Sequence, residues 1–173
     1  TLQCLALQRL LESWENEVVV FNFESTDDRS FFYKSLNYLT AATNISEFIG
    51  VCGEITAGIL GKFKKKTITI NRDLSIVFDN FIRDNLNMTH VVHEDNMAEV
   101  ASDLDAIIVG SDQVWSGFAR KKLVYLFDWE PFFKGKRISY AACSARKGVS
   151  WMNRKKVADC MRRMNAISVR DIQ

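Results

Sequence analysis

Hydrophobic and polar residues follow two periods along the chain, one typical of strands and one typical of helices. Residues 106–109 (Ala-Ile-Ile-Val) form a short apolar run without alternation, as expected of a strand buried on both faces of a parallel sheet. Residues 137–143 show the same pattern, and residues 17–23 and 166–169 are rich in β-branched and aromatic side chains. The pattern therefore predicts four strands, with a further short extended segment at residues 88–93.

Apolar residues that recur every three or four positions predict helices between these strands. The predicted helices cover residues 2–14, 31–39, 72–86, 94–104 and 151–164. The apolar face of residues 72–86 is expected to dock onto the domain. Ser150 can cap the last helix. Its inner face is expected to carry Trp151, Val157, Cys160, Met161 and Met164.

Three other segments have less regular patterns. Four glycines interrupt the apolar runs of residues 40–61, which predicts helical pieces with breaks. The lysines of residues 62–66 predict an exposed basic loop or helix end. Residues 122–129 are apolar and aromatic, and Pro131 ends that segment.

The order of these elements predicts an α/β fold, in which a Rossmann-like, mostly parallel sheet carries helices on both faces. We expect a single lobe over residues 1–173, with a helical insertion at about residues 28–104. The chain begins within a helical pattern and stops just after a strand. We therefore expect the lobe to be truncated at both ends.

Composition excludes several classes of protein. With 173 residues, of which 47% are hydrophobic and 25% charged, the chain can bury a substantial core. Its net charge of +2 is too small to indicate a nucleic-acid partner. No signal peptide or membrane-spanning stretch is recognisable, which favours a cytoplasmic protein.

Neither the cysteines nor the histidines form a metal-binding pattern. The four cysteines lack CxxC spacing and are expected to be reduced and mostly buried. His90 and His93 are accompanied only by Glu94 and Asp95, so no metal site is expected. The glycine-rich phosphate loops and the GxSxG nucleophile motif are also missing.

Polar side chains follow three of the predicted strands. Gly110, Ser111, Asp112 and Gln113 follow the 106–109 strand, Ser144 follows the next strand, and Arg170 follows the last. Parallel strands bring such positions to one edge of a sheet, where ligands usually bind. We therefore expect a shared site.

The side chains at this edge suggest particular roles. A partly desolvated Asp112 could orient a substrate hydroxyl or take its proton. Ser111 and Gln113 would bond a polyhydroxylated ligand, and Trp115 offers a face on which a sugar ring could stack. Arg170 suits a phosphate or carboxylate. Alternatively, these residues could be turn-forming residues, with Trp115 a core anchor and Arg170 paired to a neighbouring acid or a helix end.

Four blocks of the sequence carry a family resemblance. They are the helix at 1–11 before Glu17-Val18-Val19-Val20, the run from Asp105 to Trp115 with its Gly-Ser-Asp-Gln-Val-Trp motif, Arg137-Ile138-Ser139-Tyr140-Ala141-Ala142, and Ala166-Ile167-Ser168-Val169-Arg170-Asp171. In this order they resemble the N-terminal half of the polysaccharide pyruvyl transferase family.

The resemblance implies one lobe of a two-lobed fold like that of GT-B glycosyltransferases. It implies transfer of pyruvate from phosphoenolpyruvate to two hydroxyls of a hexose, forming a cyclic ketal in bacterial cell-surface polysaccharide or exopolysaccharide biosynthesis. It places Gly110, Ser111, Asp112 and Gln113 on the acceptor side of the cleft. No cofactor is implied beyond the donor substrate phosphoenolpyruvate.

The same resemblance sets expectations for partners. The sugar acceptor could be lipid-linked, the second lobe of the same enzyme would complete the site, and this lobe alone would be inactive. Peripheral membrane contact and a homo-oligomer are both compatible with such an enzyme. Two alternatives remain open, namely a nucleotide-sugar glycosyltransferase lobe of the same architecture and a non-catalytic truncated module.

Overall fold

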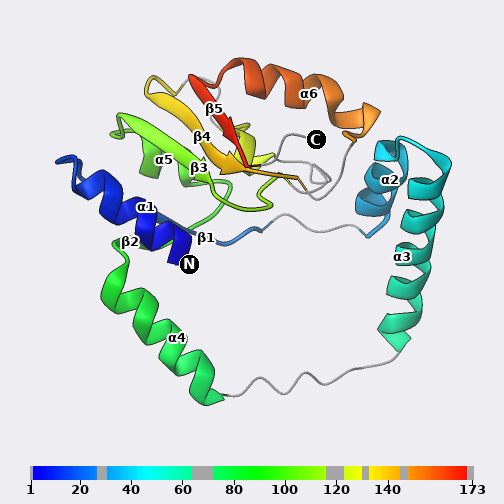
Figure 1. The fold of residues 1–173 in the computed structure, drawn as a ribbon, viewed down its shortest axis with the longest axis horizontal. Helices are drawn as coiled ribbons and strands as arrows, with labels where there is room; N and C mark the ends of the chain where they lie inside the picture. The colour runs from blue at the N-terminus through cyan, green and yellow to red at the C-terminus, as the bar shows by residue number, and fades with distance from the viewer. Residues whose placement is uncertain are drawn as a thin grey trace. The chain divides into compact units, whose positions relative to one another are not determined.

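A computed structural model of the chain describes residues 2–26, 31–63, 72–115, 123–129, 133–144 and 148–170 (Figure 1). The chain divides into two compact units. The first unit comprises residues Thr1–Ser25 and Lys65–His93, and the second comprises Thr26–Lys64 and Glu94–Gln173. No helix within these described ranges has the length and apolar character that a membrane span requires.

In its described residues, the first unit contains two helices and a pair of parallel strands. In chain order these are α1 (Leu2–Glu12), β1 (Val20–Phe23), α4 (Arg72–Asn85) and β2 (Met88–Val92). Val20 pairs with Met88 and Phe23 pairs with Val92. The ladder continues past the strands, because the amide of Glu24 donates to the carbonyl of Val92 at 2.9 Å.

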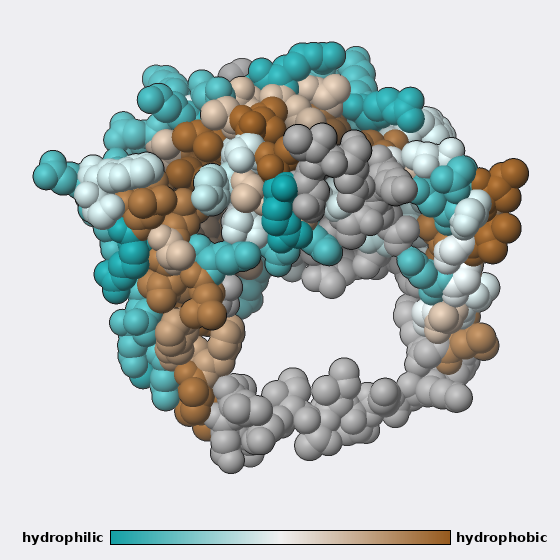
Figure 2. Space-filling view, in the orientation of Figure 1, coloured by the Kyte–Doolittle hydropathy of each residue, from teal (hydrophilic) through white to brown (hydrophobic). Residues whose placement is uncertain are grey.

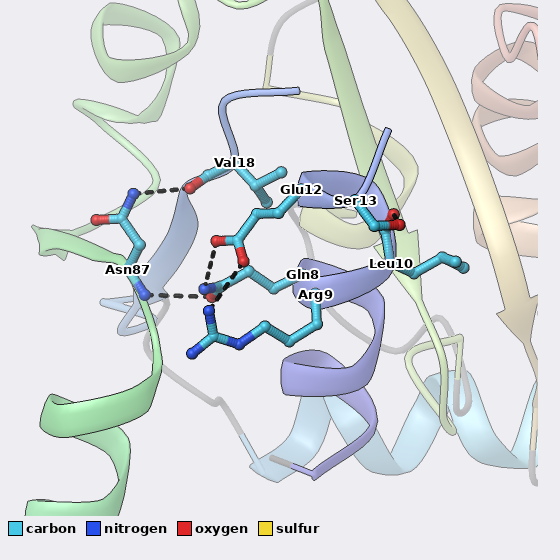
Figure 3. Close-up of polar contacts among 7 residues, drawn as sticks. All are labelled: Gln8, Arg9, Leu10, Glu12, Ser13, Val18 and Asn87. Atoms are coloured by element: carbon cyan, nitrogen blue, oxygen red, sulfur yellow. Dashed lines mark hydrogen bonds and ion pairs between the residues drawn. The ribbon is translucent and has the colours of Figure 1, made fainter. Parts of the chain in front are cut away.

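Two side-chain amides connect α1 to the segments that lead into both strands (Figure 3). Gln8 is buried, and its Nε2 donates to Glu12 Oε1 at 2.8 Å while its Oε1 accepts from the backbone amide of Asn87 at 3.2 Å. Asn87 Nδ2 in turn donates to the carbonyl of Val18 at 2.7 Å. These bonds satisfy a buried amide that would otherwise cost folding free energy.

The second unit contains a three-stranded parallel sheet. Its helices are α2 (Phe31–Ala41), α3 (Ile45–Phe63), α5 (Met97–Ala101), the short 3₁₀-helix η1 (Val124–Leu126) and α6 (Trp151–Arg162). Its strands are β3 (Ala106–Gly110), β4 (Lys136–Ala142) and β5 (Ala166–Val169), in the spatial order β3-β4-β5. Figure 1 shows α6 lying along this sheet, in the connection between β4 and β5.

The core of the second unit lies where α6 and η1 meet the sheet. Its buried residues are Trp115, Leu123, Leu126, Ala142, Val157 and Cys160. Burial raises the pKa of the Cys160 thiol, and the nearby Asp128 carboxylate raises it further. The thiol is held between the core and two charged side chains, since its Sγ accepts from Arg163 Nη2 at 3.3 Å and donates to Asp128 Oδ1 at 3.9 Å.

A buried polar network joins α2 to the start of α6. Asn153 Nδ2 donates to Asn37 Oδ1 at 3.0 Å, and the hydroxyls of Thr40 and Ser150 lie 2.7 Å apart. Ser150 also caps α6, because its side chain accepts from the amide of Met152 at 3.2 Å. These hydrogen bonds fix the position of α6 on α2, because a buried polar group that loses its partner lowers the free energy of unfolding.

The α/β class, the parallel strand pairing and the Ser150 cap are confirmed. The short extended segment predicted at residues 88–93 is confirmed as strand β2, but it pairs with β1, so the strands form two parallel sheets rather than one. The strand at 106–109 is buried only at Val109, since it is an edge strand of its sheet. The segment at 122–129, as far as it lies within the described residues, is a 3₁₀-helix followed by a turn.

Three predictions about helices are wrong. Residues 45–63 form the single helix α3, because the cap formed by Thr43, Asn44 and Glu47 at its N-terminus and its packing on α2 outweigh the intrinsic cost of glycine. Trp151 is 68% exposed rather than on the inner face of α6, since it is the first residue of that helix. The apolar residues Ile76, Val77 and Phe78 of α4 are exposed, whereas Phe81 and Ile82 in its C-terminal part are partly buried. Figure 2 shows hydrophobic surface where Figure 1 labels α4.

The α2–α6 network yields a stability prediction. Asn153→Ala should lower the free energy of unfolding by about 1–3 kcal/mol, because it leaves the buried Asn37 carboxamide oxygen without this donor. Chemical denaturation followed by circular dichroism measures the change. Arg154→Ala, at the neighbouring exposed position, is the control and should change stability by less than about 0.5 kcal/mol. Equal losses in the two variants would contradict a structural role for this hydrogen bond.

Candidate functional site

The carboxyl ends of β3, β4 and β5 meet at one edge of the sheet. Gly110 pairs with Tyr140, and Ala142 pairs with Val169, so the residues that follow each strand lie next to one another. The guanidinium Nη1 of Arg170 lies 3.6 Å from Asp112 Oδ1. The prediction that these strand ends share one edge is therefore confirmed for Asp112 and Arg170.

Backbone hydrogen bonds hold the segment after β3 across the end of β4. The amide of Cys143 donates to the carbonyl of Asp112 at 3.0 Å, and the amide of Trp115 donates to the carbonyl of Cys143 at 3.2 Å. The amide of Arg170 donates to the carbonyl of Ala142 at 3.2 Å. Because these bonds involve the main chain, the position of Asp112 and Arg170 does not depend on their own side chains.

Gly110 is required for β3 to approach β4 at this edge. Its φ is +141°, and a Cβ atom there would lie 1.8 Å from the carbonyl oxygen of Tyr140. On the other side of β4, the residues between Ser139 and Ala142 form a bulge against β5, and Ala141 has a φ of +49°. Such bulges redirect the end of a strand and often lie beside functional sites.

Asp112 and Arg170 face solvent. Their side chains are 72% and 41% exposed, so Asp112 is not desolvated as the sequence suggested. An ion pair this exposed adds little stability and can exchange its partners for those of a ligand. The carboxylate can accept hydrogen bonds from hydroxyl groups, whereas the guanidinium can bind a phosphate or carboxylate.

Cys143 supports Arg170, a role that the sequence analysis missed. Arg170 Nη2 donates to the Sγ of Cys143 at 2.9 Å, and Cys143 is buried. Its main chain also bonds both Asp112 and Trp115. The signal in the sequence was its place as the last residue of the predicted strand, directly before Ser144.

Trp115 is a core residue, which was the alternative to a sugar-stacking role. It is 6% exposed and packs in the cluster with Leu126 and Val157, while its Nε1 donates to the carbonyl of Tyr125 at 3.2 Å. Its ring face is therefore covered by protein. It fixes the far end of the segment that carries Asp112.

The remaining predicted residues lie around the same edge. Gln113 is exposed, whereas Ser111 and Ser144 are partly buried. Arg146 and the other residues of 145–147, which follow Ser144, lie outside the described residues, as does Asp171. Among the described residues, this edge presents the Asp112 carboxylate, the Arg170 guanidinium and several neutral polar groups.

The two histidines belong to the first unit. His93 Nδ1 is 2.7 Å from the carbonyl oxygen of Glu24, at the ends of β1 and β2. Within the described part of the chain, no three histidine, cysteine or acidic side chains are grouped as metal ligands.

Together, the Rossmann-like sheet and its polar edge define an α/β domain of the kind that binds polar ligands at its strand ends. Comparison by sequence specifies the family. The family described as polysaccharide pyruvyl transferase matches residues 1–173, so the chain belongs to that family. The family indicates a transferase that acts in polysaccharide biosynthesis. No curated protein and no solved structure matches the chain.

The close approach at Gly110 gives a prediction about the site. Gly110→Ala should destabilise the domain by more than about 2 kcal/mol, because the added methyl group meets the Tyr140 carbonyl at a φ that is unfavourable for alanine. Thermal unfolding measures the loss. Gly53→Ala in α3, where nothing lies within 4 Å of the added group, should be neutral or stabilising. Similar behaviour of the two variants would rule out the tight approach of β3 to β4.

Proposed function

We propose that the edge formed by β3, β4 and β5 binds the sugar acceptor of a pyruvyl transferase reaction. In this reaction a pyruvyl group passes from phosphoenolpyruvate to two hydroxyls of a hexose in a cell-surface polysaccharide or its precursor. The proposal rests chiefly on the paired exposure of Asp112 and Arg170, 3.6 Å apart, in a chain of this family.

The chemistry requires groups that move protons and groups that bind anions. Protonation of C3 of the enolpyruvyl group makes C2 electrophilic, and the first sugar hydroxyl adds its oxygen there. The second hydroxyl then forms the other C2–O bond while the bond to phosphate breaks. Of the two hydroxyl protons, one balances the proton gained by C3 and the other leaves with phosphate. Acid–base catalysis and cationic groups supply these steps without a cofactor or metal.

Asp112 is suited to the acceptor side of this reaction. Its exposed carboxylate can accept a hydrogen bond from a sugar hydroxyl, orient that hydroxyl and receive its proton. Gln113 is exposed beside it, and Ser111 and Ser144 lie at the same strand ends, where they can bond further hydroxyls. We assign Trp115 a positioning role, since the ring is buried.

Arg170 is suited to an anionic group of the donor. Its guanidinium projects beside Asp112 and is supported by Cys143, so a phosphate or carboxylate can bind it next to a sugar hydroxyl. A second lobe, in a GT-B-like arrangement, would supply the other cations and the acid that protonates C3.

The role of Asp112 predicts a loss of turnover. Asp112→Asn should lower kcat by at least about tenfold in the full-length enzyme, because an amide cannot accept the hydroxyl proton. Release of inorganic phosphate from phosphoenolpyruvate, with the acceptor present, measures kcat. Asp103→Asn is the matched control, since Asp103 is exposed and precedes β3 at the other end of the strand. If Asp112→Asn retains the wild-type kcat, Asp112 is not the base.

The role of Arg170 predicts a change in donor binding. Arg170→Gln should raise the KM for phosphoenolpyruvate by about 10-fold to 100-fold, the usual effect of losing a charge-assisted hydrogen bond. Steady-state kinetics with each substrate varied in turn measures this effect. Arg162→Gln, which removes an exposed cation of α6, is the control. A rise in the acceptor KM alone would place Arg170 on the acceptor side instead.

Mass spectrometry of the product distinguishes this function from that of a nucleotide-sugar glycosyltransferase of the same architecture. A cyclic pyruvyl ketal and a glycoside add different masses to the acceptor. Transfer of a sugar residue in place of a pyruvyl group would overturn the proposed reaction while leaving the fold unaffected.

A further inference from the structure

Cys143 is buried at the strand ends, and the main chain fixes its position. It follows β4 directly and is 8% exposed. Its amide donates to the carbonyl of Asp112 at 3.0 Å, and its carbonyl accepts from the amide of Trp115 at 3.2 Å. Because these bonds involve no side-chain atoms, the Cys143 sulfur is attached to a point that does not move when exposed side chains change their rotamers.

The guanidinium of Arg170 is held on two sides. Nη2 donates to Cys143 Sγ at 2.9 Å, and Nη1 lies 3.6 Å from Asp112 Oδ1. The amide of Arg170 also donates to the carbonyl of Ala142, the residue before Cys143, at 3.2 Å. A guanidinium is planar, so contacts to two of its nitrogens define the orientation of the whole group.

The two contacts of the guanidinium differ in how firmly they are held. The Asp112 side chain is 72% exposed, so water competes for it and the ion pair contributes little. The Cys143 sulfur belongs to a buried residue on a fixed backbone. The contact with Cys143, rather than the ion pair with Asp112, is therefore the one that orients Arg170.

A sulfur acceptor suits an arginine that has to bind an anion. Sulfur is a weak hydrogen-bond acceptor, whereas phosphate and carboxylate oxygens are strong ones. A guanidinium has five N–H donors, so it can keep its bond to sulfur while it binds an anion. An arginine that is oriented beforehand also loses less conformational entropy when the anion binds. The contact therefore favours anion binding without competing strongly for the guanidinium.

We propose that Cys143 is a positioning residue, whose sulfur holds the guanidinium of Arg170 in place for the anionic group of the donor. Cys143 acts only through Arg170, so the inference rests on the function proposed above for that arginine. It assigns no proton transfer to Cys143. The donor KM, rather than kcat, is therefore the quantity that depends on the sulfur.

Steady-state kinetics of the full-length enzyme test the proposal. Cys143→Ala should raise the KM for phosphoenolpyruvate by about threefold to tenfold, the range expected when one hydrogen bond of ordinary strength is lost. The variant should keep kcat within about twofold of the wild type, because the acid and base groups are untouched. Cys143→Ser retains an acceptor at the same position and should keep the donor KM within about twofold of the wild type.

A second buried cysteine provides the matched control. The Sγ of Cys160 also accepts from an arginine, Arg163 Nη2, at 3.3 Å, but Cys160 belongs to α6 in the core of the unit. Cys160→Ala should leave the KM for phosphoenolpyruvate unchanged. Circular dichroism checks that each variant is folded. If Cys143→Ala does not fold, Cys143→Val fills more of the space left by the thiol and still lacks the acceptor, and it takes the place of the alanine variant.

A double-mutant cycle separates positioning from a general structural role. If Cys143 acts through Arg170, Cys143→Ala should not raise the donor KM further in an enzyme that already carries Arg170→Gln. A loss of packing alone would raise the KM by the same factor in both backgrounds.

Four outcomes would overturn the inference. They are a wild-type donor KM in the folded Cys143 variants that lack an acceptor, an equal loss in Cys143→Ser, an equal loss in Cys160→Ala, and effects of Cys143→Ala and Arg170→Gln that multiply. Failure of the proposed function gives a different result. In that case Arg170→Gln itself keeps the wild-type donor KM, and the role of Cys143 is overturned together with that of Arg170.

Discussion

The main chain of Cys143 accepts a hydrogen bond from the amide of Trp115 and donates one to the carbonyl of Asp112. These two bonds extend the β3–β4 ladder beyond the last paired residues and turn the segment after β3 across the end of β4. Trp115 then enters the core, where its indole is covered by residues of α6 and η1. The exposed carboxylate is thus attached to a short segment that is held at both ends, by β3 and by the core. Sites held by rigid elements keep their geometry better than sites on free loops.

Packing around this edge depends on backbone features that few residues tolerate. Gly110 permits an approach to Tyr140 that no side chain could fit, and the bulge at Ala141 shifts the end of β4 relative to β5. The bulge brings Ala142 level with Val169, and Arg170 follows directly. The bulge in β4 therefore sets the position of the Arg170 guanidinium beside the Asp112 carboxylate. Backbone strain of this kind is commonly retained at functional sites.

Much of the second unit could be predicted from local sequence. The apolar run before Gly110 predicts strand β3. The periodicity of residues 151–164 predicts helix α6, and Ser150 marks its start. The order of strands and helices then predicts parallel pairing. The bulge at Ala141 and the contact of Cys143 with Arg170 could not be predicted, because they depend on register between strands distant in the sequence. The prediction of breaks in residues 40–61 was wrong for a different reason, because the effect of the glycines depends on what surrounds the helix. Glycine weakens a helix, but the capping of α3 and its packing on α2 outweigh that intrinsic cost.

The exposure of the Asp112–Arg170 pair constrains how the site can work. In water, opposite charges 3.6 Å apart attract each other weakly, because solvent screens them and hydrates both ions. A sugar and an anionic donor that cover the pair would remove that water, and each contact to carboxylate or guanidinium would then become stronger. The two groups would also have separate roles, with sugar hydroxyls bound to the Asp112 carboxylate and an anion bound to the Arg170 guanidinium. Under the proposed function, the site would gain its electrostatic strength from the substrates that cover it, and exposed charged groups could then serve chemistry that usually occurs away from water.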